Sequence, residues 1–278
     1  MASPFNEATG LTPSPSSLET DASVWSKAQT FTGSLEVQLL LKDAACDAVR
    51  KRLAEGLRGH VWKACRCPHA NHVVQKCIIN LKPTQVQFVI DEILAAGRRA
   101  TARLARHQYG CRILQRLIEH CSPGQVSRLA QDLLVEVAAL SVHQYGAYVM
   151  ACLVEHGAEE HGHTVATALI DSAACVASTL RGPLVLHAVL LFADAEDQQA
   201  LAAALHDVAD LLPRLARGSP GLRLALWLLP KIRDPERLRQ ELHGAAPNFT
   251  TSKAVRSLRA LARQIPRSAD ADTEATEA

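Results

Sequence analysis

Apolar residues recur at helical spacing through most of the chain, from residue 33 to about residue 265. The segments QVQFVIDEILAAG and CRILQRLIEHC carry Leu, Ile and Val three and four positions apart, which is typical of helices with one buried face. The same region contains few β-branched runs and no Asn-Gly or Asp-Gly dipeptide that would favour a β-hairpin. The pattern therefore predicts an all-α domain over residues 33–265.

The two ends lack this pattern. Residues 1–32 are rich in Ser, Thr and Pro, and residues 266–278 read PRSADADTEATEA, so we predict a disordered leader and a disordered acidic tail. The opening MASPFNEATG has the character of neither a secretory nor an organellar targeting segment, and we expect no membrane span. Eight cysteines in helical stretches are expected to be free, mostly buried thiols. We expect a cytoplasmic protein, with the nucleus or nucleolus as alternatives.

Internal repeats organise the helical region. HQYGCRILQRLIEH at 107–120 aligns with HQYGAYVMACLVEH at 143–156 at an offset of 36, and with PHANHVVQKCIIN at 68–80 at an offset of 40. The linkers repeat the offset of 40 independently, in the pairs Pro83/Pro123, Gln85/Gln125 and Val86/Val126. Fainter copies follow at 180–191, 219–229 and 252–261. Six units of 33–40 residues indicate a helical solenoid, in which each unit buries its apolar face against its neighbours.

Each unit is predicted to contain three helices. In the best copy a proline starts the first helix, RRATARLARH supplies a short second one, and a His-x-Tyr-Gly turn leads into the third. We expect the glycine before the third helix to provide freedom in φ that other residues lack; Ala70 and Ala254 replace it in two units.

Charge is strongly polarised along the chain although the net charge is only +2. Residues 50–120 carry a net +10, residues 121–213 a net −9, and residues 214–267 a net +9. A basic segment of this kind is typical of proteins that bind nucleic acid, but basic residues also cover the solvent-exposed faces of ordinary helices. Charge alone leaves both interpretations open.

The third helices carry the chemistry of interest. Two polar residues one turn apart can reach the edge of one planar ring, and a flat residue beside them can stack on its face. Asn71 with Gln75 and Cys111 with Gln115 form such pairs, and the flat residues beside the pair positions are His72, Arg112 and Tyr148. These are the requirements for recognising single-stranded RNA at one base per unit.

The units NHVVQK, YGCRILQRLIE and HQYGAYVMACLVE resemble repeats of the Pumilio/FBF (PUF) family over roughly residues 57–156, and more weakly over 157–261. The resemblance implies a right-handed superhelix with the third helices lining a concave face. It also implies binding of single-stranded RNA, such as mRNA 3′ regions, in post-transcriptional regulation.

The resemblance further implies a role for each residue of the pairs. Asn71 and Gln75 would contact uracil with His72 stacking, and Cys111 and Gln115 would contact adenine with Arg112 stacking. Because the family binds RNA antiparallel to the chain, the implied core is 5′-A-U-3′.

Later units depart from this pattern. Tyr148 keeps a stacking ring, but Ala147 and Ala151 beside it are apolar. The equivalent positions 183/184/187, 222/223/226 and 255/256/259 do not carry a complete set of two polar residues and one flat residue. We therefore predict base reading in two units and otherwise salt-sensitive contacts with the RNA backbone. The second half is a candidate surface for a protein partner.

Two other functions remain open: a protein-binding scaffold that has lost RNA binding, and a factor for structured or ribosomal RNA. No nucleotide-binding loop, nucleophile elbow or paired-carboxylate motif occurs, so we expect no enzyme and no cofactor. Cys65, Cys67 and His69 do not have the spacing of a structural zinc site, and we predict no metal. His156, Glu159, Glu160, His161 and His163 are interpreted as a solvated loop. We expect a monomer.

Overall fold

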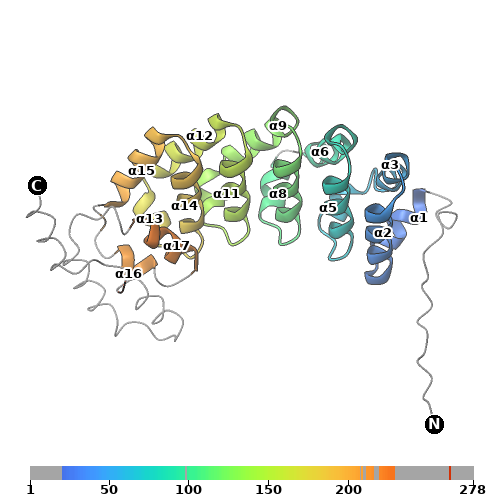
Figure 1. Ribbon diagram of the computed structural model, residues 1–278, viewed down its shortest axis with the longest axis horizontal. Helices are drawn as coiled ribbons and strands as arrows, with labels where there is room; N and C mark the ends of the chain where they lie inside the picture. Colours follow the sequence, from blue (N-terminus) through green and yellow to red (C-terminus); the bar gives the residue numbers. More distant parts are fainter. Residues whose placement is uncertain are drawn as a thin grey trace, which may run out of the picture. The chain divides into compact units, whose positions relative to one another are not determined.

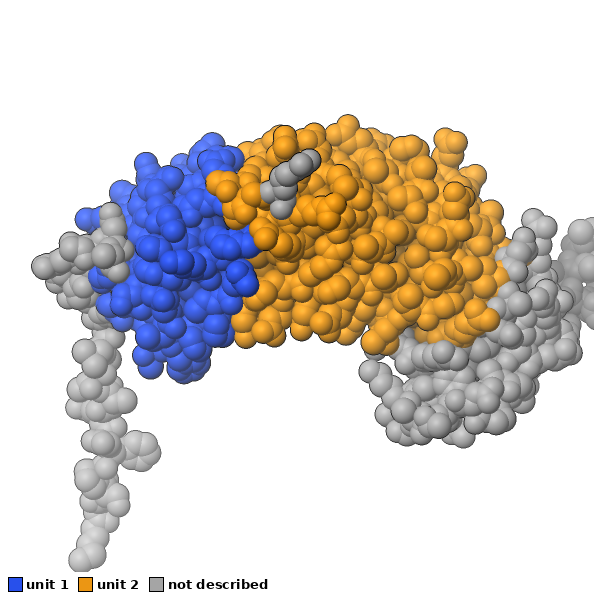
Figure 2. All heavy atoms as spheres, turned by 180° about the vertical axis from the view of Figure 1, so that it is seen from behind, with its two compact units in different colours: residues 1–92 blue, residues 93–278 orange. Residues whose placement is uncertain are grey.

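The computed structural model describes residues 21–97, 99–206, 208, 211–215, 219–228 and 263, and the regular elements among them are all helical (Figure 1). The all-α prediction is confirmed. Within this described part no helix is long and apolar enough to cross a membrane. The chain divides into two compact units, residues 1–92 and 93–278, which Figure 2 shows in different colours.

The first unit opens with two helices that pack on each other and on a later one. Its elements are α1 (Asp21–Ala28), α2 (Phe31–Asp43), α3 (Asp47–Glu55), α4 (Val61–Ala64), α5 (Ala70–Asn80), the 3-10 turn η2 (Pro83–Gln85) and most of α6 (Gln87–Ala95). Helix α2 packs against α1 and α5. The predicted boundary at residue 33 is thus too late, because Val24 and Ala28 of α1 are already buried. A helix of eight residues is too short for its periodicity to stand out.

The second unit repeats a three-helix arrangement. Its elements are α7 (Ala100–Ala105), α8 (Gly110–His120), α9 (Pro123–Leu134), α10 (Val137–Ser141), α11 (Gly146–His156), α12 (Glu159–Ile170), α13 (Ala173–Ala177), α14 (Gly182–Phe192), α15 (Ala195–His206), α16 (Leu211–Leu215) and α17 (Ser219–Leu228). The third helices α8, α11, α14 and α17 contact one another in chain order, and α9, α12 and α15 do the same (Figure 1). The fold is the predicted helical solenoid.

The prolines predicted to start the first helix of each repeat lie at or just before helix starts in the structure. Pro123 occupies the first position of α9, where Ser122 and Gln125 form a capping box. Pro83 opens the 3-10 turn before α6. The copies inferred from sequence correspond to α5, α8, α11, α14 and α17, whereas the copy at 252–261 lies outside the described residues.

The glycine before the third helix has a different purpose from the one predicted. The positive φ angles among described glycines belong to Gly59 and Gly97, not to the repeat glycines. Instead, a Cβ on Gly110 would lie 2.8 Å from the carbonyl oxygen of Leu104, and one on Gly146 would lie 2.8 Å from that of Leu140. Close packing onto the short helix therefore requires glycine here, because an added methyl group would collide with backbone.

A capping side chain three positions before this glycine starts the third helix. In successive units this residue accepts a hydrogen bond from the backbone N–H of the glycine, or of Ala70 in α5. The distances are 3.2 Å for Thr30, 3.5 Å for Cys67, 3.3 Å for His107, 3.2 Å for His143 and 2.9 Å for Thr179. Since the first N–H groups of a helix lack intrahelical partners, this contact satisfies one of them in the first turn of each third helix.

One segment predicted as a solvated loop is a helix. Residues Glu159–Ile170 form α12, and its first-turn acids Glu159 and Glu160 suit the positive end of the helix dipole. His161 is buried, and its Nδ1 atom accepts a hydrogen bond of 3.1 Å from the backbone N–H of Ala158. This histidine caps the helix, and the solvated-loop interpretation was wrong.

Candidate nucleic-acid interface

The Asn71–Gln75 pair on α5 is held by hydrogen bonds. Asn71 is buried, with 1% of its surface exposed, and its Nδ2 donates to the carbonyl oxygens of Cys67 at 2.8 Å and Pro68 at 2.9 Å. Its Oδ1 accepts from Gln75 Nε2 at 2.9 Å. Gln75 is only half-buried, and its Oε1 has no hydrogen-bond partner among the described residues. Asn71 thus orients the Gln75 amide, which retains a free acceptor and a second N–H.

The equivalent pair on α8 is buried more deeply. Cys111 and Gln115 are 2% and 7% exposed, and Gln115 Nε2 donates to the Cys111 carbonyl oxygen at 2.9 Å. The Cys111 thiol donates to the carbonyl oxygen of Gln108 at 3.5 Å. Burial raises the pKa of this thiol, so that it is uncharged at neutral pH. The α8 position therefore offers a neutral thiol and one oriented amide.

The flat residues lie beside these pairs, and two of the three are exposed. His72 and Arg112 are exposed, whereas Tyr148 on α11 is half-buried. The Arg112 guanidinium lies 5.9 Å from the centre of the Tyr148 ring. A base sandwiched between two flat groups needs about 7 Å, two contacts of roughly 3.5 Å each. An opening of about 1 Å would therefore admit a base between Arg112 and Tyr148.

Arg181 also contacts the Tyr148 ring, a contact that the sequence pattern does not predict. Its guanidinium lies 5.5 Å from the ring centre, and its Nη1 donates to the Tyr148 hydroxyl at 2.8 Å. Arg181 directly precedes Gly182, as Tyr145 directly precedes Gly146, and this repeat position was the available signal. The ring of Tyr148 is thereby fixed in position.

Helix α2 is a third helix that the sequence analysis also missed. A Cβ on Gly33 would collide with the carbonyl oxygen of Lys27, six residues back, as in the repeats of the second unit. Ser34 is buried, and Gln38 Nε2 donates to its hydroxyl at 3.0 Å and to its carbonyl oxygen at 3.2 Å. The spacing Gly33, Ser34, Gln38 matches Gly110, Cys111, Gln115 and could have revealed this unit. The flat position is taken by the exposed Leu35.

The later units present no comparable pair within the described residues. Ala147 and Ala151 on α11 are both buried, and Pro183 on α14 is buried beside the half-buried His187. Burial lowers the pKa of His187, helped by the nearby Arg223 charge. Leu222 and Leu226 on α17 are half-buried, and positions 255, 256 and 259 lie outside the described residues.

Several cations of the basic segment are engaged in ion pairs. Arg58 pairs with Glu55, Arg106 with Glu136 at 2.6 Å, and Arg116 with Glu119 at 2.7 Å. Arg112 differs, because no carboxylate of the described residues lies within ion-pair distance of it. The cation beside the α8 pair is thus available to a ligand.

Three stretches of the chain match a model of a known repeat family. A model described as "Pumilio-family RNA binding repeat" matches residues 61–94, 101–134 and 136–167. A curated relative from Saccharomyces cerevisiae, Pumilio homology domain family member 4, is 33% identical over 88 residues, which are 32% of this chain and 10% of the relative. Suppressor protein MPT5 of the same yeast is 34% identical over 62 residues, or 22% and 7% of the two chains. The matches thus span a tenth or less of these relatives.

Solved structures extend the likeness over most of the chain. A crystal structure of PUF-8 in complex with PBE-RNA matches with a TM-score of 0.71 and 19% identity, covering 88% of this chain and 72% of the other. The Puf3 RNA binding domain bound to the Cox17 RNA 3′ UTR recognition sequence site B matches with a TM-score of 0.70 and 15% identity, covering 86% and 73%. At these identities the match establishes a shared fold.

Proposed function

Because this chain is a divergent member of the Pumilio repeat family, we propose that it binds single-stranded RNA through its third helices. We further propose a role in post-transcriptional regulation of mRNA in the cytoplasm. The observation that carries the proposal is the recurrence of one arrangement in α2, α5 and α8. Each of these helices carries a buried residue one turn before a glutamine whose amide is hydrogen-bonded to it.

This arrangement suits a base edge chemically. A primary amide presents one donor and one acceptor side by side, which complements the adjacent donor and acceptor on the edge of uracil or adenine. Prior hydrogen bonding to Asn71 or Cys111 holds the glutamine amide in place, so less side-chain entropy is lost on binding. The oriented amides therefore favour base recognition over a purely structural role.

The pairs give a testable order of bases. Family resemblance assigns uracil to Asn71 and Gln75, and adenine to Cys111 and Gln115, in an antiparallel arrangement. Helix α2 precedes α5 in the chain, so the Ser34–Gln38 pair would contact the base that follows uracil on its 3′ side. The proposed site is therefore 5′-A-U-N-3′, one base longer than the sequence analysis implies.

Stacking provides the second part of the interaction. Arg112 and Tyr148 can sandwich a base, and such stacking contributes about 1–3 kcal/mol per base. Two or three bases specify little, so contacts between the net +10 segment and phosphates supply much of the affinity. Binding is therefore expected to weaken steeply as salt rises.

The decisive experiment measures binding of the full chain to labelled single-stranded RNA by fluorescence anisotropy at two salt concentrations. The double variant Asn71→Ala/Gln75→Ala is expected to lose about 5- to 150-fold in affinity for RNA with 5′-A-U, since a good edge contact is worth about 1–3 kcal/mol. The control is Asn80→Ala on the same helix, where the amide donates to the Lys76 carbonyl oxygen at 2.8 Å. This control should bind like the unmodified protein.

Other outcomes point to the alternative functions. An absence of binding to any RNA at low salt, with the protein folded, would refute the proposal and favour a protein-binding scaffold. Equal loss in the Asn71→Ala/Gln75→Ala and Asn80→Ala variants would refute edge reading. Preference for a duplex over a single strand, abolished by charge reversal at Arg99 and Arg103, would favour a structured-RNA factor.

A further inference from the structure

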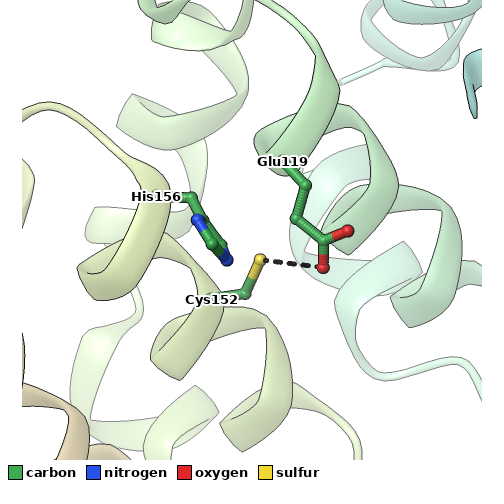
Figure 3. A group of neighbouring side chains, drawn as sticks. All are labelled: Glu119, Cys152 and His156. Atoms are coloured by element: carbon green, nitrogen blue, oxygen red, sulfur yellow. Dashed lines mark hydrogen bonds between the residues drawn. The ribbon is translucent and has the colours of Figure 1, made fainter.

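Helices α8 and α11 bring a glutamate, a cysteine and a histidine together. The side chains of Glu119, Cys152 and His156 converge on one point between the two helices (Figure 3). One potential ligand atom from each residue lies within 4.8 Å of the other two. The Cys152 Sγ atom is 3.8 Å from Glu119 Oε1.

The spacing of these residues places them on the faces of α8 and α11 that pack against each other. Cys152 and His156 are four apart on α11, so both point to the same side of that helix. Glu119 is four residues after Gln115 on α8 and supplies the third group from the neighbouring helix. Two ligands one turn apart, completed by a third from a packed element, form a common type of metal site.

The cluster is buried at Cys152 and exposed to solvent at Glu119 and His156. Cys152 is 7% exposed, whereas the side chains of Glu119 and His156 are 20% and 42% exposed. A metal ion at this point would have three protein ligands on one side and solvent on the other. Sites with three protein ligands and one open position are typical of zinc outside purely structural centres.

We propose that Glu119, Cys152 and His156 bind one Zn²⁺ ion, with water at the fourth position. Thiolate, imidazole and carboxylate together match zinc better than the harder Mg²⁺ or Ca²⁺ ions, which prefer oxygen ligands alone. The sequence pattern does not predict this metal site, because the ligands come from two successive repeats and form no linear motif. The assignment does not depend on RNA binding.

The distances agree with a tetrahedral ion after a small adjustment. Zinc bonds of about 2.3 Å to sulfur and about 2.0 Å to oxygen or nitrogen place ligand atoms roughly 3.3–3.7 Å apart. The observed 3.8 Å between Cys152 Sγ and Glu119 Oε1 is close to that range. The remaining adjustment falls on His156, which lies on the exposed rim and can rotate.

The surrounding charges are compatible with the ion. Arg116 binds the other carboxylate oxygen of Glu119, Oε2, at 2.7 Å, so that Oε1 remains directed at the thiol. Glu155 adds a further negative charge near Cys152. An ordinary cysteine thiol carries its proton at neutral pH. Zinc binding forms the Zn–S bond and releases this proton to the buffer.

The test uses the full chain, stripped of metal with a chelator, without RNA. Titration with Zn²⁺ in a calorimeter, in two buffers of different ionisation enthalpy, is expected to give one ion and about one proton released per chain. Substitution of Co²⁺ should produce a thiolate-to-metal charge-transfer band. Cys152→Ser, His156→Gln and Glu119→Gln should each weaken zinc binding at least about tenfold.

Matched controls use the same residue types elsewhere. Cys175→Ser and His206→Gln change an exposed cysteine and an exposed histidine outside the cluster, and should bind Zn²⁺ normally. If Cys152→Ser fails to fold, His156→Gln on the rim carries the test. The proposal is overturned if no ion binds, if binding survives in the folded triad variants, or if the controls lose it equally.

Discussion

Helices α8 and α14 begin in the same way and differ in what they present. Gly110 and Gly182 each pack closely on the short helix before them, and a side chain three residues earlier, His107 or Thr179, accepts a hydrogen bond from the glycine N–H. After this shared start, α8 carries the polar pair Cys111 and Gln115. Helix α14 has Pro183 and His187 at the same places. The scaffold and the ligand-facing pair are therefore separable parts of the repeat.

The two parts are under different physical constraints. A side chain at Gly110, Gly146 or Gly182 would collide with the backbone of the preceding short helix, which cannot move without unpacking two helices. At the pair positions an apolar residue is tolerated, because it needs no hydrogen-bond partner when buried. A unit that no longer recognises a base can thus lose its pair and keep its fold, as Ala147 and Ala151 illustrate on α11.

The largest effect is expected from breaking the shared scaffold in a unit without a pair. Gly146→Val should lower the free energy of unfolding by about 1–3 kcal/mol, because the new side chain overlaps the Leu140 backbone and side chain. Urea denaturation measures the change. In the control Gly124→Ala, where nothing lies within 4 Å of the added carbon, stability should stay nearly constant. Equal stability of the two variants would show that close packing does not explain the glycine.

Installing the missing pair on α11 tests whether the scaffold alone suffices for recognition. Ala147→Asn/Ala151→Gln reproduces the arrangement of Asn71 and Gln75 beside the stacking ring of Tyr148. We expect about a tenfold gain, roughly 1.4 kcal/mol, for RNA with uracil on the 5′ side of the A-U core. The reversed variant Ala147→Gln/Ala151→Asn has the same composition and should show no such preference. A gain in both variants would contradict position-specific reading.

The sequence predicts those features that recur at a constant offset. Three helices per unit, the prolines and the pairs at Asn71 and Cys111 all follow from self-alignment. Features that depend on contacts between residues far apart in the sequence cannot be predicted in this way. The sequence favours φ freedom as the reason for the repeat glycines, because it shows the residue but not the Leu104 carbonyl oxygen beside Gly110. Helix α2 was missed because Gly33, Ser34 and Gln38 keep the spacing while the His-x-Tyr residues before the glycine are replaced.

A smaller effect is expected at the newly recognised unit. Ser34→Ala/Gln38→Ala removes one edge-facing pair that has no flat aromatic or guanidinium neighbour, since Leu35 lies beside it. A net hydrogen-bond loss of about 0.5–1.5 kcal/mol corresponds to roughly 2- to 12-fold weaker RNA binding. Anisotropy with RNAs that vary only in the base 3′ of uracil measures it. Gln29→Ala, on an exposed residue bonded to the Trp25 carbonyl oxygen, is the control. An unchanged affinity would confine base reading to α5 and α8.

The smallest effect separates the two kinds of cap, histidine and threonine. Burial, and next the Arg106 charge, lower the pKa of His143, whose Nδ1 must be unprotonated to accept from the Gly146 N–H. As pH falls below about 6.5, the unfolded chain takes up a proton that the folded chain resists, so stability decreases. Thr179 makes the same cap with a hydroxyl that does not titrate in this range. His143→Thr should therefore show a smaller drop in melting temperature than the unmodified protein between about pH 7.5 and pH 5.5. An identical drop in both would mean that protonation of this cap does not contribute.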